Sequence, residues 1–74
     1  MNITFRQLRI FLALADTGSV SAVARMMHIT QPTVSMQLKE ITQSVGVPLY
    51  EWVGKKIYLT DAGRLLASTA RSMT

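Results

Sequence analysis

The stretch that decides the fold is residues 19–45, with the sequence SVSAVARMMHITQPTVSMQLKEITQSV. Its first half repeats apolar residues at the i, i+3, i+4, i+7 spacing of one buried helical face, namely Val20, Val23, Ala24 and Met27. Its second half places a further apolar set on a single face, namely Val34, Leu38, Ile41 and Val45. Only residues 28–30 separate the two sets, which leaves room for a tight turn. The stretch therefore predicts a helix-turn-helix, with helices over about 19–27 and 31–45.

The second of these helices is predicted to begin abruptly. Thr30 is placed as its N-cap, where the hydroxyl can accept a hydrogen bond from an amide of the first turn. Pro32 follows in that turn, where a missing N–H costs no intrahelical hydrogen bond. A helix that starts in this way presents its N-terminal residues outward, which is the arrangement that contacts the major groove of DNA.

Another helix is predicted to precede this pair, over residues 4–15. Thr4 and Gln7 have the spacing of a capping box at its start. Gly18 is expected to take a left-handed conformation after its end. We expect the apolar face of this helix to be Phe5, Leu8, Phe11, Leu12 and Ala15, widened by Ile10 and Leu14.

The spacing of apolar residues changes after residue 45, where Gly46 and Pro48 are expected to stop the helix. Residues 49–52 and 57–59 are predicted to be short strands around a glycine-containing turn at 53–56. Strands this short are marginal alone, so we expect the hairpin to pack against the helices as a wing. The adjacent lysines Lys55 and Lys56 lie at its tip.

A last helix is predicted to begin after Thr60, its N-cap, with Asp61 near the positive helix end. We expect this helix, and the protein, to continue beyond residue 74. The positions that continue its helical spacing are Leu65, Leu66, Thr69, Ala70 and Met73. The predicted fold class is mainly α: a winged helix-turn-helix of three helices plus a small β-hairpin over 1–60, then the start of a linker helix over 61–74.

Composition limits the function classes. The 74 residues carry a net charge of +4 with 16% charged residues, so an anionic partner is plausible, although the basic residues are spread along the chain. No cysteine is present and no apolar run approaches a membrane span, so we expect a cytoplasmic domain without disulfides and without a membrane partner. We expect no catalysis, no metal and no cofactor here, because no nucleophile–base pair, phosphate-binding glycine loop or metal cluster is apparent.

The exposed face of helix 31–45 carries the side chains that can contact bases. Its stripe of Pro32, Met36, Lys39 and Gln43 is flanked by Thr33, Ser35 and Gln37, with Gln31 at the tip. Glutamine, serine and threonine can hydrogen-bond base edges. A merely solvated face typically has charged i, i+4 pairs, yet residues 30–38 carry no charge, which favours DNA contact.

Several residues have a structural and a functional interpretation. Met36 is either a loosely packed surface residue or a contact to a thymine methyl group, and Ser19 and Ser21 either cap a helix or bind phosphate. The wing lysines are either a solvated turn or contacts to phosphates and the minor groove. We expect His28 to have a structural role in the turn, and Tyr50 and Trp52 to cover the core rather than form stacking platforms.

These residues resemble the DNA-binding domain of LysR-type transcriptional regulators. The similarity spans nearly the whole chain and is most specific in Thr30-Gln31-Pro32-Thr33-Val34-Ser35-Met36-Gln37-Leu38, in Leu49-Tyr50-Glu51 and in Leu59-Thr60-Asp61-Ala62-Gly63. The resemblance implies that two copies pair through the linker helix, at Leu65, Leu66, Thr69, Ala70 and Met73. It also implies a tetramer for the full-length protein and an effector-binding domain outside this chain that takes a small molecule. Met36 and Trp52 depart from the family, which often has arginine at both positions.

Roles follow position by position from this resemblance. The implied base contacts are Gln31, Pro32, Thr33, Ser35 and Met36. The backbone or minor-groove contacts that we expect are Ser19, Ser21, Gln37, Lys39, Lys55 and Lys56. The predicted function is sequence-specific binding of double-stranded DNA, as a homodimer on an interrupted palindrome. The alternatives are a winged-helix regulator of another family, such as the MarR type, and a winged helix used as a protein-interaction scaffold.

Overall fold

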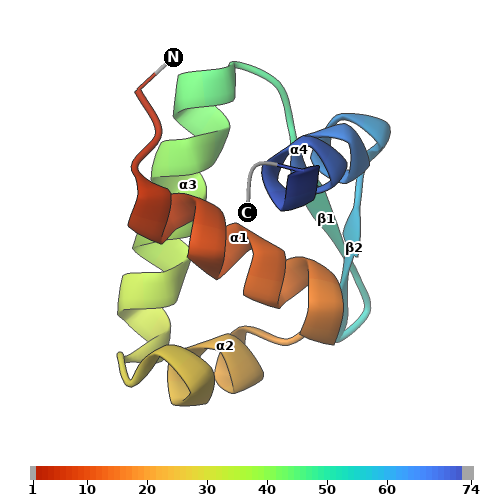
Figure 1. Cartoon of the computed structure of the whole chain (residues 1–74). Helices are drawn as coiled ribbons and strands as arrows, with labels where there is room; N and C mark the ends of the chain where they lie inside the picture. The colour runs from red at the N-terminus through yellow and green to blue at the C-terminus, as the bar shows by residue number, and fades with distance from the viewer. Residues whose placement is uncertain (1, 73–74) are drawn as a thin grey trace.

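The computed structural model describes residues 2–72 as four helices and one two-stranded sheet (Figure 1). The elements are α1 (Phe5–Thr17), α2 (Val20–Met27), α3 (Gln31–Val45), β1 (Tyr50–Val53), β2 (Lys56–Leu59) and α4 (Asp61–Ser72). Helix α1 crosses the centre, with α3 along the left of the view, α2 below, and the hairpin and α4 on the right (Figure 1). The predicted winged helix-turn-helix is confirmed.

Local capping chemistry sets the helix ends. Thr4 and Gln7 form the predicted capping box at the start of α1, and the hydroxyls of Ser19 and Thr30 cap α2 and α3. Gly18 and Gly46 end α1 and α3 with φ of 65° and 87°, a left-handed conformation that glycine adopts without a steric penalty. These caps were predicted, although α1 runs two residues further than expected.

The turn between α2 and α3 depends on an unusual backbone angle. His28 has φ of 58°, the only positive φ at a non-glycine among residues 2–72. Its N–H donates to the carbonyls at the end of α2, and Ile29 donates to the Ala24 carbonyl at 3.0 Å. The left-handed residue reverses the chain within the three residues that separate the helices, so the histidine has a structural position in the turn.

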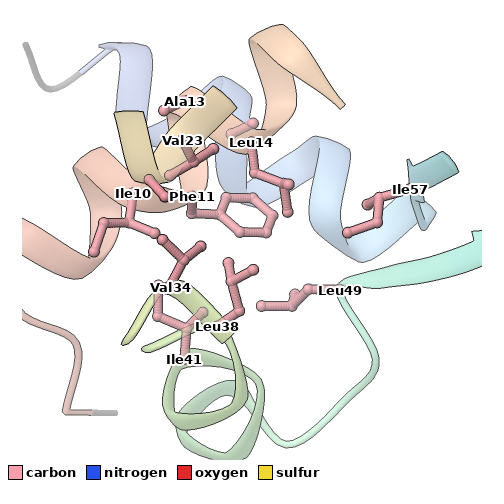
Figure 2. Close-up of a cluster of buried hydrophobic side chains, with 12 residues drawn as sticks. Ile10, Phe11, Ala13, Leu14, Val23, Val34, Leu38, Ile41, Leu49 and Ile57 are labelled. Atoms are coloured by element: carbon pink, nitrogen blue, oxygen red, sulfur yellow. The ribbon is translucent and has the colours of Figure 1, made fainter. Parts of the chain in front are cut away.

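A single core holds these elements together (Figure 2). Its largest fully buried side chains come from all three N-terminal helices and the start of the wing: Ile10, Phe11, Leu14, Val23, Val34, Leu38, Ile41 and Leu49. Leu49 points toward Leu38 in this cluster, below the ring of Phe11 in the view (Figure 2). The predicted inward faces of α2 and α3 are thus confirmed.

The predicted face of α1 was wrong at its N-terminal end. Phe5 is 67% exposed, whereas Gln7 is only 6% exposed. Because α1 contacts α2, α3 and α4, its buried surface is centred on Ile10, Phe11 and Leu14 and lies to one side of the stripe we expected. Phe5, in the first helical turn, lies outside that buried surface.

The hairpin is tighter than predicted. The strands pair from Tyr50 opposite Leu59 to Val53 opposite Lys56, so the turn comprises only Gly54 and Lys55. Gly54 has φ of 64°, while Lys55 has a negative φ, the pattern of a type II′ turn that suits the twist of paired strands. Lys56 therefore lies in the ladder, one position below the tip.

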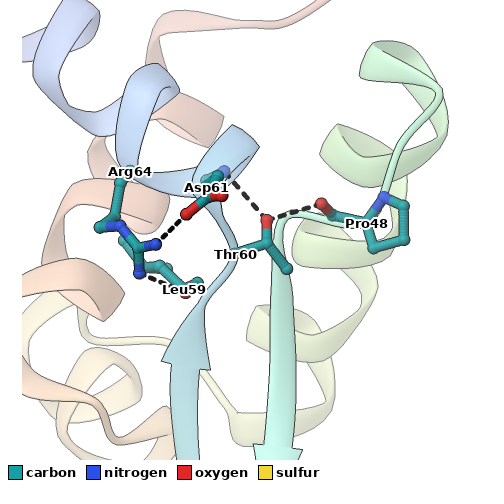
Figure 3. A network of polar contacts seen from close by, with 6 residues as sticks. Pro48, Leu59, Thr60, Asp61 and Arg64 are labelled. Carbon is teal, nitrogen blue, oxygen red and sulfur yellow. Dashed lines mark hydrogen bonds and ion pairs between the residues drawn. The ribbon is translucent and has the colours of Figure 1, made fainter.

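Helix α4 is seated on the base of the hairpin. A Cβ added to Gly63 would lie 1.9 Å from the Leu49 carbonyl oxygen, so only glycine fits this contact. The Thr60 hydroxyl donates to the Pro48 carbonyl at 2.7 Å and accepts from the Gly63 amide at 3.1 Å (Figure 3). Arg64 pairs with Asp61 beside it (Figure 3). Within residues 2–72, no helix has the length and apolarity needed to span a membrane.

Candidate nucleic-acid interface

The exposed side of α3 presents the residues expected to contact bases. Val34, Leu38 and Ile41 are at most 1% exposed and fix the opposite side in the core. On the outer side, four of the five expected base contacts are exposed and one is half-buried: Gln31, Pro32, Ser35 and Met36, then Thr33. Met36 is 51% exposed. The N-terminal half of α3 therefore offers amide, hydroxyl and thioether groups on one surface.

The tip of α3 is tied to the start of α2. The Gln31 Nε2 atom donates to the Ser21 hydroxyl at 3.0 Å, which holds the glutamine side chain across the turn. The Ser19 hydroxyl accepts a hydrogen bond from the Ala22 amide at 3.1 Å, so of its two possible roles the structure shows the helix cap. Thr30 and Thr33 share a 2.8 Å hydrogen bond between their hydroxyls. These contacts restrict the rotamers at the α3 N-terminus before any ligand is present.

A polar network missed by sequence reasoning joins α1 to the middle of α3. The buried Gln7 Nε2 atom donates to Gln37 Oε1 and to Glu40 Oε2, both at 3.0 Å. Its Oε1 atom accepts from the Thr4 amide at 3.1 Å, so every polar atom of this side chain has a partner. Gln37, expected to contact the DNA backbone, is half-buried and retains only its amide nitrogen for that purpose. The one sequence feature that could have indicated this network is the polar Gln7, which lies three residues before Ile10 on the inward side of α1.

A crevice of about 560 Å³ lies between the start of α2 and the wing. Its lining residues include both predicted phosphate contacts of α2, the tip of α3 and both wing lysines: Ser19, Ser21, Gln31, Lys55 and Lys56. The structure thus brings together side chains that are up to 37 residues apart in sequence, from Ser19 to Lys56. Hydroxyl, amide and ammonium groups on both walls are donors suited to phosphate oxygens.

The prediction that Trp52 covers the core was wrong. Trp52 pairs with Ile57, which is 6% exposed, but its own side chain is 58% exposed and lines the crevice. The core ends at Ile57 and Leu49, so the next position along β1 extends past it toward the hairpin tip. Tyr50, by contrast, packs against the core as expected.

Tyr50 also links the wing to the C-terminal half of α3. Burial raises the pKa of its phenol above the ordinary value, and a hydrogen bond with Thr42 opposes that rise. Lys39 and Gln43 lie beside this pair, at a shallow hollow that Tyr50 also lines. Lys39 is therefore exposed on the same side of α3 as the hairpin, and its contact with the DNA backbone stays a prediction.

The charges are distributed unevenly. Two of the four acidic residues, Asp16 and Asp61, form ion pairs with Arg71 and Arg64 on α4. A third, Glu40, accepts from Gln7. Lys55 and Lys56 are exposed at the wing. The fourth, Glu51, is exposed on β1, so the wing carries two positive charges and one negative charge beside the uncharged N-terminal half of α3.

The residues expected to pair two copies are differently placed along α4. Leu65 is 70% exposed and Thr69 is exposed, whereas Leu66 is half-buried and Ala70 is 3% exposed within the single chain. All four line an apolar groove of about 570 Å³ between α4, the chain start and the end of α3. Met73 lies outside the described residues.

Comparisons with known proteins agree with this arrangement. Residues 5–64 match the bacterial regulatory helix-turn-helix proteins of the LysR family. The HTH-type transcriptional activator CmpR of Synechocystis sp. is 47% identical over 73 residues, which are 99% of this chain and 24% of that protein. The chain thus spans about a quarter of the length of the curated relatives that it matches.

Solved structures of related domains have the same fold. The DNA-binding domain of CbnR, in complex with DNA, gives a TM-score of 0.90 at 35% identity, over 96% of this chain and 82% of that one. The corresponding BenM domain, bound to its benA site 1 DNA, gives 0.90 at 25% identity, over 96% and 80%. The chain belongs to the LysR family of bacterial regulatory helix-turn-helix proteins, as a DNA-binding domain of that family.

Proposed function

We propose that this domain binds double-stranded DNA with the N-terminal half of α3 in the major groove and the hairpin wing in the adjacent minor groove. The observation that carries the proposal is the crevice, which places Gln31 at the tip of α3 opposite Lys55 on the wing. A DNA strand that separates the two grooves would run between them. The related CbnR and BenM domains were solved as DNA complexes, which supports the same use here.

The proposed base contacts are Gln31, Pro32, Thr33, Ser35 and Met36. Gln31 has an amide that can form a bidentate pair with adenine, and Met36 has a methyl group that can contact the thymine methyl. The hydrogen bond from Gln31 to Ser21 supports this role, because it positions the amide before DNA arrives. The proposed backbone contacts are Ser19, Ser21, Gln37, Lys39, Lys55 and Lys56.

We also propose that two copies pair through α4 and bind an interrupted palindrome. The 70% exposed Leu65 supports this, because it is continuous with an apolar groove, and a contiguous apolar patch marks a surface that contacts another protein. Two-fold pairing would set the spacing of the two half-sites. In the whole protein, we propose a homotetramer that acts in the cytoplasm and takes a small-molecule effector in sequence outside this chain.

The test is to capture fragmented genomic DNA on the purified domain at near-physiological salt and to sequence what binds. We expect an enriched motif with two-fold symmetry. Binding without any motif would contradict base contact by α3 and leave only phosphate contacts. A failure to bind any DNA would overturn the proposal and favour a protein-interaction scaffold.

A further inference from the structure

Trp52 is an exposed aromatic residue that the fold itself does not use. Its side chain is 58% exposed, although tryptophan is a residue that gains much from burial. No group among residues 2–72 accepts a hydrogen bond from its indole N–H. The side chain therefore has an apolar face and a donor that are both available to a partner.

Its position limits what that partner can be. Trp52 lines the crevice together with Ser21, Gln31 and Lys55, between the tip of α3 and the tip of the wing. Side chains alternate along a strand, so the neighbouring Val53 points to the other side of the hairpin with a nearly equal exposure of 57%. The indole is thus aimed at the space that the proposed function gives to the DNA backbone.

The chemistry of the two groups is complementary. The indole Nε1–H is a donor only, and a phosphate oxygen is an acceptor only. A deoxyribose beside that phosphate offers C–H surface to the indole ring. Stacking on a base is less suitable here, because the bases of a duplex are already stacked on each other, whereas the sugar and phosphate are accessible.

We propose that Trp52 is a DNA-backbone contact that works without charge: its N–H donates to a phosphate and its ring packs against the adjoining sugar. This inference rests on the proposed DNA-binding function. The inference divides the binding free energy of the wing into two components. Lys55 acts through counterion release and is weakened by salt, whereas Trp52 supplies binding free energy that salt leaves largely unchanged.

The experiment compares wild type with Trp52→Ala, Trp52→Phe and the matched control Val53→Ala. Two duplexes of equal length serve as probes, one with the motif recovered by capture and one with that motif scrambled. We expect Trp52→Ala to weaken binding to both duplexes about tenfold, the scale of a lost charge-assisted hydrogen bond and its packing. Trp52→Phe should fall between wild type and Trp52→Ala, and Val53→Ala should match wild type.

Two further readouts separate contact from folding. The slope of log affinity against log salt should be the same for Trp52→Ala and wild type, because no counterion is involved. Trp52 is the only tryptophan in the chain, so the emission of the unmodified domain should change on titration with either duplex, and acrylamide should quench it less in the complex.

The inference is overturned if Trp52→Ala binds as tightly as Val53→Ala, or if saturating DNA leaves the emission and its quenching unchanged. If either result is found while wild type still binds the motif duplex, only the role of Trp52 fails and the proposed function stands. If wild type binds neither duplex, the proposed function fails as well.

Discussion

Helix α3 and the hairpin wing lie on either side of one crevice, but the domain holds them differently. Helix α3 is fixed by Val34, Leu38 and Ile41, each at most 1% exposed, and by the hydrogen bonds from Gln7. The hairpin is anchored by Ile57 at 6% exposure, with its tip outside the core. Base contacts need a fixed geometry, whereas a lysine contacts a phosphate as a point charge and tolerates movement. The difference in anchoring therefore fits the different contacts that we propose for the two elements.

The largest expected effect tests that anchoring. Leu38→Ala removes a fully buried side chain and should lower the free energy of unfolding by about 2–5 kcal/mol, because it leaves a cavity under α3. Val53→Ala in the hairpin, where the side chain is 57% exposed, should change it by less than about 0.5 kcal/mol. Urea denaturation of both variants measures the two values. Equal losses would contradict the contrast between the two elements.

The second prediction concerns the base of the wing rather than its tip. Gly63→Ala would place a Cβ 1.9 Å from the Leu49 carbonyl oxygen, so the backbone must shift. We expect a loss of about 1–3 kcal/mol, the usual cost of overpacking. Ser68→Ala, at an exposed position of the same helix, is the matched control and should be near neutral. Thermal unfolding of the two variants measures both changes in stability. A neutral Gly63→Ala would show that the hairpin base is as adaptable as its tip.

The third prediction addresses base contact by α3. Gln31→Ala should cost about 1–3 kcal/mol of binding free energy on the motif duplex and relax the preference at one base position. Gln43→Ala, also exposed on α3 but near its C-terminal end, should leave the preference unchanged. Binding to a set of single-base variants of the motif measures both. If Gln31→Ala keeps affinity and preference intact, the recognition surface has been placed wrongly.

The fourth prediction addresses the wing. Lys55→Ala should weaken binding to motif and scrambled duplexes alike and reduce the salt slope by about 0.9, the value for one phosphate contact. Lys55→Arg keeps the charge and should retain the slope. Affinities measured over a series of salt concentrations give these slopes. A loss confined to the motif duplex would mean that the wing discriminates between sequences.

The smallest expected effect concerns Tyr50, which joins the wing to α3. Burial raises the pKa of its phenol, so the native state holds this proton more tightly than the unfolded chain does. The resulting stability is complete below the unfolded pKa of about 10 and is lost as pH rises through the higher native value. Tyr50→Phe should therefore show a shallower loss of stability in strongly alkaline solution. Unfolding curves at several pH values measure the pH dependence of stability. The control is Tyr58→Phe, at an exposed tyrosine on the other side of the hairpin. Identical pH profiles for Tyr50→Phe and wild type would contradict the prediction.

The elements that depend on neighbours in sequence were predictable. The capping box of Thr4 and Gln7, the left-handed Gly18 and the start of α3 at Thr30 are local chemistry, and the structure confirms each. The inward faces of α2 and α3 also followed from periodicity alone.

The errors arose where tertiary contacts decide. Periodicity placed Phe5 in the core, but α3 contacts the first turn of α1 on the Gln7 side and leaves Phe5 67% exposed. Trp52 was assigned to the core because of its size, yet the core ends before its position on β1. The second role of Gln7, as a link to Gln37 and Glu40, joins residues at least 30 apart and has no local signature.

The seat of α4 has a mechanical consequence. Gly63 allows the helix to approach the Leu49 carbonyl with no space for even a methyl group, and Thr60 hydrogen-bonds to Pro48 across the same junction. Leu49 immediately precedes β1, so α4 is in direct contact with the first residues of the hairpin. We therefore expect the distance between the wing and α3 to depend on the placement of α4, so that a force applied to α4 would change the width of the crevice.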